Sequence, residues 1–180
     1  MKINWKNKQI ARLSVKSKNL RTFLFESGSL TRLIQEKCMG RFDINLINES
    51  WAKALPYEMH LLSLRNYEIS FIRESYLSCN KKKLVYARTI IPRRTLNRKN
   101  EKLTKLGHKP LGEILFKNNQ THRKNVKYGK ISIMNEPHIE ALLKEKILDD
   151  LFVRQSMFYI DDRPLLVVEF FLPAIVKYSQ

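Results

Sequence analysis

The sequence of 180 residues is poor in the residues and runs that mark several protein classes. It has five glycines and six prolines, whereas 43% of its residues are hydrophobic, so a disordered, linker-like or collagen-like chain is excluded. Its two cysteines, Cys38 and Cys79, lie far apart without a C-x-x-C spacing, so we expect neither a disulfide scaffold nor a cysteine-rich zinc site. No apolar run approaches the roughly 18 residues of a membrane span. The best candidate, residues 164–176, is interrupted by Glu169 and Pro173, so no membrane span is predicted.

Standard catalytic signatures are also missing. The sequence contains no Walker A loop, no G-x-G-x-x-G, no G-x-S-x-G and no H-E-x-x-H motif. Its histidines, which are His60, His108, His122 and His138, are isolated and typical of surface or packing positions. We therefore do not expect a metal-dependent or nucleotide-dependent enzyme.

Positive charge is what the sequence has in excess. Lys and Arg number 34 against 17 Asp and Glu, which gives a net charge of +17, and residues 81–130 hold sixteen of the bases but only two of the acids. Such a block is typical of a nucleic-acid or anionic membrane partner. However, Lys, Ile and Asn, whose codons are A/T-rich, supply 50 residues, against 17 from Gly, Ala and Pro. This bias indicates a compact A/T-rich genome, such as that of an organelle, so we attribute most of the charge to a solvated surface and do not expect a nucleic-acid partner. A basic RNA- or ribosome-associated protein is kept as one alternative.

The hydrophobic pattern predicts an α+β fold built from local hairpins. Helices are predicted at residues 18–26, 29–38 and 95–106 and from Pro137 onward, with Ser29 as an N-cap. Alternating patterns predict strands at residues 42–46, 67–77, 84–91, 156–160 and 165–172. The second and third of these strands, and the last two, are expected to form hairpins. Without a βαβ rhythm, the sheet should be antiparallel.

Two charged residues, Arg73 and Glu169, lie on strand faces that are otherwise apolar. Their neighbours on those faces are Ile69, Phe71 and Leu77 for the first and Leu165, Val167 and Phe171 for the second. Because a buried charge is costly unless it is paired or hydrogen-bonded, each residue needs a partner. One interpretation is a structural ion pair between the two, or the extension of one of the charged groups to solvent at a sheet edge. The other is a binding site in which Arg73 holds a carboxylate and Glu169 accepts a hydrogen bond from a ligand hydroxyl. The glycine-bracketed turn at residues 106–112 could then present N–H groups to an anion.

These segments resemble the chorismate lyase (chorismate–pyruvate lyase) family. The resemblance is carried, in this order, by residues 28–33, 71–74, 87–92, 106–116 and 165–173. It spans about residues 27–173 and is strongest to the branch found in cyanobacteria and in some algal plastid genomes. The resemblance implies one domain over residues 1–180, with residues 1–26 as a basic N-terminal extension and first helix. It also implies an antiparallel sheet of about six strands with helices on one face.

The resemblance further implies a lyase that converts chorismate to 4-hydroxybenzoate and pyruvate for quinone biosynthesis, without a metal or an organic cofactor. Arg73 and Glu169 fall on the family's ligand-binding arginine and glutamate and would be the catalytic residues. Leu111 falls on a backbone ligand contact and Leu30 on a flap position, and both would bind the substrate. The protein is expected to be a monomer in the plastid stroma or, alternatively, in a bacterial cytoplasm.

Two departures from the family pattern bear on activity. Where many members have two arginines before a serine, this chain has Arg154, Gln155 and Ser156, and residues 117–152 show little resemblance. The fold is also similar to a ligand-binding domain of bacterial transcription regulators. A non-catalytic sensor of aromatic acids is therefore the main alternative function.

Overall fold

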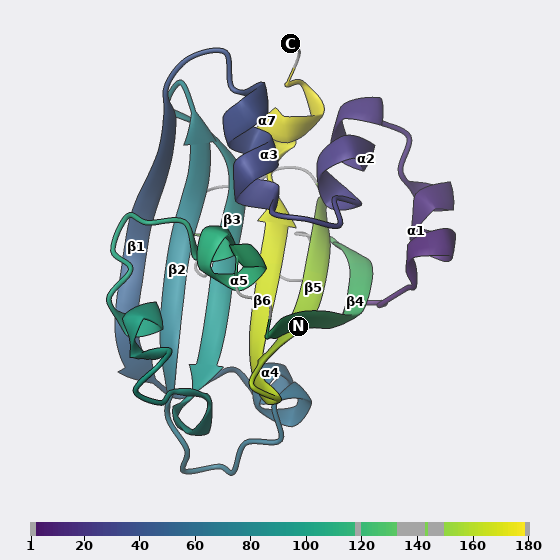
Figure 1. Ribbon diagram of the computed structural model, residues 1–180. Helices are drawn as coiled ribbons and strands as arrows, with labels where there is room; N and C mark the ends of the chain where they lie inside the picture. Colours follow the sequence, from purple (N-terminus) through teal and green to yellow (C-terminus); the bar gives the residue numbers. More distant parts are fainter. Residues whose placement is uncertain (1–2, 118–119, 133–142, 144–149, 179–180) are drawn as a thin grey trace.

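An antiparallel sheet of six strands organises the part of the chain that the computed structural model describes, which is residues 3–117, 120–132, 143 and 150–178 (Figure 1). The strands are β1 (Phe42–Ala52), β2 (Ser70–Cys79), β3 (Lys82–Pro92), β4 (Thr121–Ile131), β5 (Leu151–Ile160) and β6 (Arg163–Phe171). Their order across the sheet is β1-β2-β3-β6-β5-β4. The predicted α+β class and both predicted hairpins are confirmed.

The two-residue turns of these hairpins explain their tightness. Asn80 and Lys81 connect β2 to β3, and Asp161 and Asp162 connect β5 to β6, all four with φ between 48° and 65°. Positive φ at both central positions suits the right-handed twist of the flanking strands, and Asn and Asp tolerate it better than most residues.

Helices α2 (Lys18–Leu24), α3 (Leu30–Lys37) and α5 (Leu111–Lys117) lie over one face of the sheet (Figure 1). Helix α1 (Lys8–Ser14) lies beside the edge strand β4, and α7 (Pro173–Val176) follows β6. The side chain of Ser29 accepts a hydrogen bond from the backbone N–H of Arg32 and caps α3, as predicted. By contrast, α4 (Pro56–Leu61) contributes Met59 to the apolar cluster on the opposite face. No helix in the described part of the chain is long and apolar enough to cross a membrane.

The helix-covered face holds two separate apolar clusters. One joins α1, α2, α3 and α7 to sheet residues such as Ile44, Leu77 and Phe171. The other joins Leu111 and Leu115 of α5 to a different part of the sheet. Between these two clusters the helices cover the sheet, but apolar side chains do not fill the space. Polar side chains can therefore lie there.

One predicted helix is wrong, one strand was not predicted, and one predicted helix lies outside the described residues. The helix expected at 95–106 is replaced by two short 3₁₀ turns, Arg93–Thr95 and Glu101–Thr104. The side chains of Asn97 and Asn100 accept hydrogen bonds from backbone N–H groups in this segment and so compete with a helix. Strand β4 was not predicted because its sequence is polar and shows little alternation. The helix expected from Pro137 lies outside the described residues, apart from position 143.

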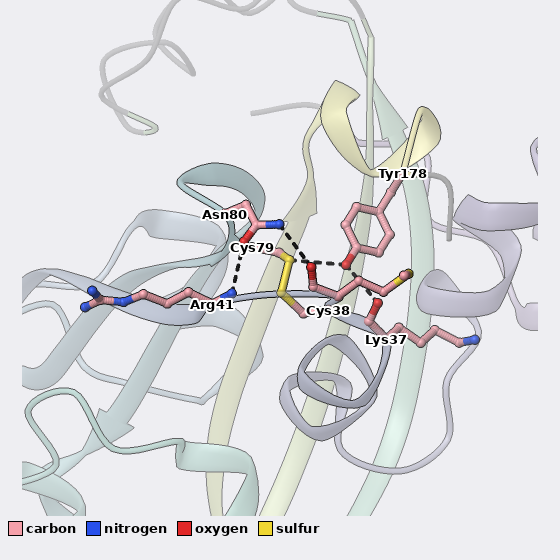
Figure 2. Close-up of a disulfide and its surroundings, with 7 residues drawn as sticks. Lys37, Cys38, Arg41, Cys79, Asn80 and Tyr178 are labelled. Carbon is pink, nitrogen blue, oxygen red and sulfur yellow. Dashed lines mark hydrogen bonds between the residues drawn. A yellow bond between two sulfur atoms is a disulfide. The ribbon is translucent and has the colours of Figure 1, made fainter.

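A disulfide between Cys38 and Cys79 corrects the expectation drawn from the cysteines (Figure 2). Cys38 ends α3, and Cys79 ends β2 opposite Phe42, so the pairing of β1 with β2 brings the two Cα atoms to 5.8 Å, within the range that a disulfide bridges. The hydroxyl of Tyr178 contacts Cys79 Sγ at 3.3 Å and donates to the carbonyl of Lys37 at 2.9 Å. The C-terminal end of α3 is thereby fixed to the sheet and to the C-terminal segment.

Candidate active site

A pocket lies between the sheet and helices α3 and α5. All four residues predicted to form the site, Leu30, Arg73, Leu111 and Glu169, line it, and each is buried. The structure therefore brings together residues from distant parts of the sequence.

The register of the sheet explains how these side chains meet. One row across the strands runs from Glu49 on β1 through Arg73, Thr89 and Val167 to Ser156 on β5. The adjacent row on the same face contains Ser75, Ala87, Glu169 and Arg154. Because Ala87, Thr89 and Val167 carry small side chains between the charged groups, they form a floor on which a flat ring can lie.

The guanidinium of Arg73 donates hydrogen bonds to a carboxylate, a hydroxyl and two backbone carbonyls. Its Nε donates to Glu49 Oε1 at 3.0 Å, and its Nη1 donates to the hydroxyl of Ser75 at 3.3 Å. Its Nη2 donates to the carbonyls of Gly107 and Lys109, at 2.8 and 3.2 Å. The glycine-bracketed turn thus orients the arginine through its carbonyls, a role that sequence analysis did not anticipate.

Burial lowers the pKa of Arg73 from its usual value, and the adjacent carboxylate of Glu49 offsets part of the effect. A buried guanidinium that keeps its charge is a strong ligand for a carboxylate, because its hydrogen bonds are charge-assisted and little water competes for them.

Glu169 pairs with Arg154 on the neighbouring strand and not with Arg73. The Arg154 Nε donates to Glu169 Oε2 at 2.6 Å and its Nη2 to Oε1 at 2.8 Å, a bidentate ion pair. The predicted ion pair between Arg73 and Glu169 is therefore wrong, since each has its own partner. Each carboxylate oxygen has a second lone pair. Glu169 can therefore still accept a hydrogen bond from a ligand in the cavity that it lines.

Arg123 on β4 is a further cation at the cavity. Its Nε and Nη2 donate to the hydroxyl of Ser156 at 3.1 and 2.9 Å, and its Nη1 donates to the carbonyls of Glu26 and Ser27. Burial lowers the pKa of Arg123, and the like charge of Arg154 lowers it further, while Glu169 and Glu26 act in the opposite direction. The local sequence does not mark this residue, because it is one basic residue among many in a polar segment.

Helices α3 and α5 close the cavity and touch each other. A Cβ atom added to Gly112 would lie 2.6 Å from Ser29 Oγ, so a larger residue would require a shift where α5 approaches the cap of α3. Leu30 and Leu111 each begin one of the two helices. Leu111 lines the cavity as the first residue of α5, and the first N–H groups of a helix have no intrahelical partner.

Another hollow on the protein is larger and more open. Among the described residues that line it there is no arginine, aspartate or glutamate. The described part of the chain also contains no group of three or more His, Cys, Asp or Glu side chains placed to hold a metal ion. The cavity with Arg73 and Glu169 is therefore the candidate active site.

The fold and the site together define a class: an α+β protein whose antiparallel sheet carries buried arginines and a glutamate in a helix-covered cavity. The chain belongs to the chorismate lyase family, whose model matches residues 1–180.

Curated relatives agree with this assignment. The chain is 33% identical over 160 residues to a "probable chorismate pyruvate-lyase" of Methylococcus capsulatus, covering 88% of this chain and 97% of that protein. A protein of the same description from Nitrosomonas europaea is 35% identical over 159 residues, covering 87% of this chain and 88% of that protein.

Among solved structures, the effector domain of PhnF from Mycobacterium smegmatis is similar with a TM-score of 0.58 and 13% identity, over 83% of this chain and 91% of that domain. At this identity the likeness concerns the fold alone.

Proposed function

We propose that this protein converts chorismate to 4-hydroxybenzoate and pyruvate, as a carbon–oxygen lyase. The observation that carries the proposal is the burial of Arg73 and Glu169 in one cavity, on either side of a floor of small side chains. Chorismate has a ring carboxylate and, across the ring, a hydroxyl group. A guanidinium and a carboxylate separated by such a floor match these two groups.

Each site residue then has a role. Arg73 binds the ring carboxylate, and Glu169 accepts a hydrogen bond from the 4-hydroxyl. The N–H of Leu111 provides a further donor from the start of α5, and Leu30 covers the ligand from the start of α3. Arg73 and Glu169 are each fixed by an ion pair, so the site is organised before the substrate arrives.

The reaction needs positioning more than reactive side chains. The C3–O bond to the enolpyruvyl group and the C4–H bond break, and the ring becomes aromatic as 4-hydroxybenzoate. The enolpyruvyl fragment takes up a proton and leaves as pyruvate, so atoms and charge balance. Because aromatisation supplies the driving force, the residues of the cavity act by holding a reactive conformer and by stabilising charge on the departing group.

Two site variants test these roles. Purified Arg73→Ala and Glu169→Gln should form 4-hydroxybenzoate on the order of 100-fold more slowly than the wild type, since each loses a charged contact to the substrate. The control is Glu113→Ala, which removes an exposed carboxylate of α5 and should retain activity. Product formation is followed by absorbance. If both site variants kept wild-type activity, the assignment would be wrong.

The same proteins and ligands distinguish the lyase from the main alternative, a non-catalytic sensor. A sensor would bind chorismate or 4-hydroxybenzoate in calorimetry and yield no product at high protein concentration. The RNA-associated alternative predicts RNA binding that falls steeply with salt and is unaffected by Arg73→Ala.

The proposal extends to the setting of the protein. We propose one chorismate lyase-like domain over residues 1–180, monomeric, related to the cyanobacterial and plastid-encoded branch and acting in quinone biosynthesis in the plastid stroma or a bacterial cytoplasm. The excess of Lys, Ile and Asn supports an A/T-rich genome of origin. Size-exclusion chromatography with light scattering tests the monomer, for which a mass of 21.4 kDa is expected.

A further inference from the structure

Arg123 lacks the negatively charged partner that the other two arginines of the cavity have. Arg73 is paired with Glu49 and Arg154 with Glu169, whereas the hydrogen bonds of Arg123 go to neutral oxygens, that of Ser156 and those of the backbone. No carboxylate in the described part of the chain forms a salt bridge with it. A buried guanidinium without a counter-charge is costly, and a bound anion would remove that cost.

The position of Arg123 relative to Arg73 follows from the sheet. The hydroxyl that its guanidinium contacts belongs to Ser156, which stands in the same row as Arg73 with Thr89 and Val167 between them. Three strand spacings separate the backbones of Arg73 and Ser156, which is about 14 Å. The long side chain of Arg73 extends into the cavity from one end of this row, and that of Arg123 reaches Ser156 at the other end. The two guanidiniums are therefore placed at opposite ends of the cavity floor.

In the orientation that the proposed function assigns, the bound substrate extends from Arg73 towards Arg123. If its ring carboxylate lies at Arg73 on β2 and its hydroxyl at Glu169 on β6, the ring spans the floor between these strands. The enolpyruvyl ether stands on the ring carbon next to the one that bears the hydroxyl. It therefore extends past β6, towards β5 and β4, where Arg123 lies.

We propose that Arg123 binds the second carboxylate of the substrate, that of the enolpyruvyl group. This inference rests on the proposed lyase function and adds to it the residue that distinguishes substrate from product, because 4-hydroxybenzoate has lost this carboxylate. In the reaction, Arg123 stabilises the fragment as the C3–O bond breaks and holds it until pyruvate leaves. A guanidinium without a salt-bridge partner at this end of the cavity also favours a dianion over a monoanion.

The test compares chorismate with 4-hydroxybenzoate in Arg123→Gln. We expect kcat/KM for chorismate to fall on the order of 100-fold, as for loss of a charge-assisted contact, while the inhibition constant of 4-hydroxybenzoate changes by less than about threefold. Arg123→Lys keeps the charge but not the planar fork and should give an intermediate loss. Lys124→Gln removes the same charge from the neighbouring position, where the side chain lies by the ring of Tyr159, and should leave both constants unchanged.

Two outcomes would overturn the inference. Equal losses for both ligands would mean that Arg123 only holds the segment at Glu26 and Ser27 in place, and wild-type kcat/KM in Arg123→Gln would mean that it does not touch the substrate. If the glutamine variant does not fold, the lysine variant provides the same comparison of ligands.

A different result would reject the proposed lyase activity without deciding the role of Arg123. If the wild type binds chorismate without forming product, the lyase assignment is wrong. The ratio of the dissociation constants for chorismate and 4-hydroxybenzoate, measured in the wild type and in Arg123→Gln, then still decides whether Arg123 binds a second carboxylate.

Discussion

Replacing Glu169 with alanine should lower the free energy of unfolding by about 3–5 kcal/mol, because it leaves the buried guanidinium of Arg154 without its counter-charge. The side chain of Arg154 is only 2% exposed, and two hydrogen bonds of 2.6 and 2.8 Å to Glu169 are lost together. Three backbone carbonyls, those of Phe23, Leu24 and Glu26, remain as acceptors but supply no charge. Since the free energy of unfolding of a whole domain is about 5–15 kcal/mol, this loss is a large part of it.

Urea unfolding of the ligand-free protein, followed by the fluorescence of its two tryptophans, measures this loss. Glu113→Ala is the matched control: its carboxylate pairs with Lys117 on an exposed surface, so its removal should cost less than about 1 kcal/mol. Arg154→Met should also be costly, and the double variant Arg154→Met/Glu169→Leu should cost clearly less than the sum of the single changes. A Glu169→Ala protein within about 1 kcal/mol of the wild type would refute the reasoning.

Three further changes test other contacts. Cys38→Ser should lower the free energy of unfolding by about 4 kcal/mol, the loop-closure value for the 41 residues that separate it from Cys79, and a reductant should have the same effect on the wild type. A protein whose urea midpoint is insensitive to reductant would contradict the bridge. Gly112→Ala should lower the free energy of unfolding by about 1–3 kcal/mol and weaken chorismate binding, because its Cβ would press on Ser29. An unchanged KM for chorismate would contradict the contact of α3 with α5. Arg88→Met breaks the buried ion pairs with Glu58 and Glu74, which lie outside the cavity, and should lower the free energy of unfolding by about 3–5 kcal/mol. The folded variant should keep the kcat of the wild type. A loss of kcat without a loss of stability would place Arg88 in the active site.

Much of the site could be predicted because buried charge is conspicuous in an apolar strand. Glu169 stands among Leu, Val and Phe, and Arg73 shares its strand face with Phe71 and Leu77, so the pattern alone indicates that both side chains need partners. The sequence could not say which partners, because the register of β1 on β2 and of β5 on β6 decides this. It pairs Glu49 with Arg73 and Arg154 with Glu169, and the two predicted residues meet only across the cavity.

Other features gave no local signal. Arg123 stands in a polar segment of the basic block, where neither apolar neighbours nor alternation mark it, and only the addition of β4 to β5 places it over Ser156. The disulfide likewise depends on the chain bringing the end of α3 to the end of β2, which no cysteine spacing records. The predicted helix at 95–106 does not form because Asn97 and Asn100 bind the backbone locally, a competition that apolar periodicity does not reveal.

The most direct test of the central claim is the stoichiometry of products from chorismate with the wild-type protein. 4-Hydroxybenzoate is measured by absorbance after chromatography and pyruvate by a coupled reduction to lactate, with Arg73→Ala as the control. Equimolar amounts of the two products, formed in proportion to the wild-type protein and nearly absent with the variant, are predicted. Chorismate that is bound but recovered unchanged, or consumed without 4-hydroxybenzoate, would contradict it.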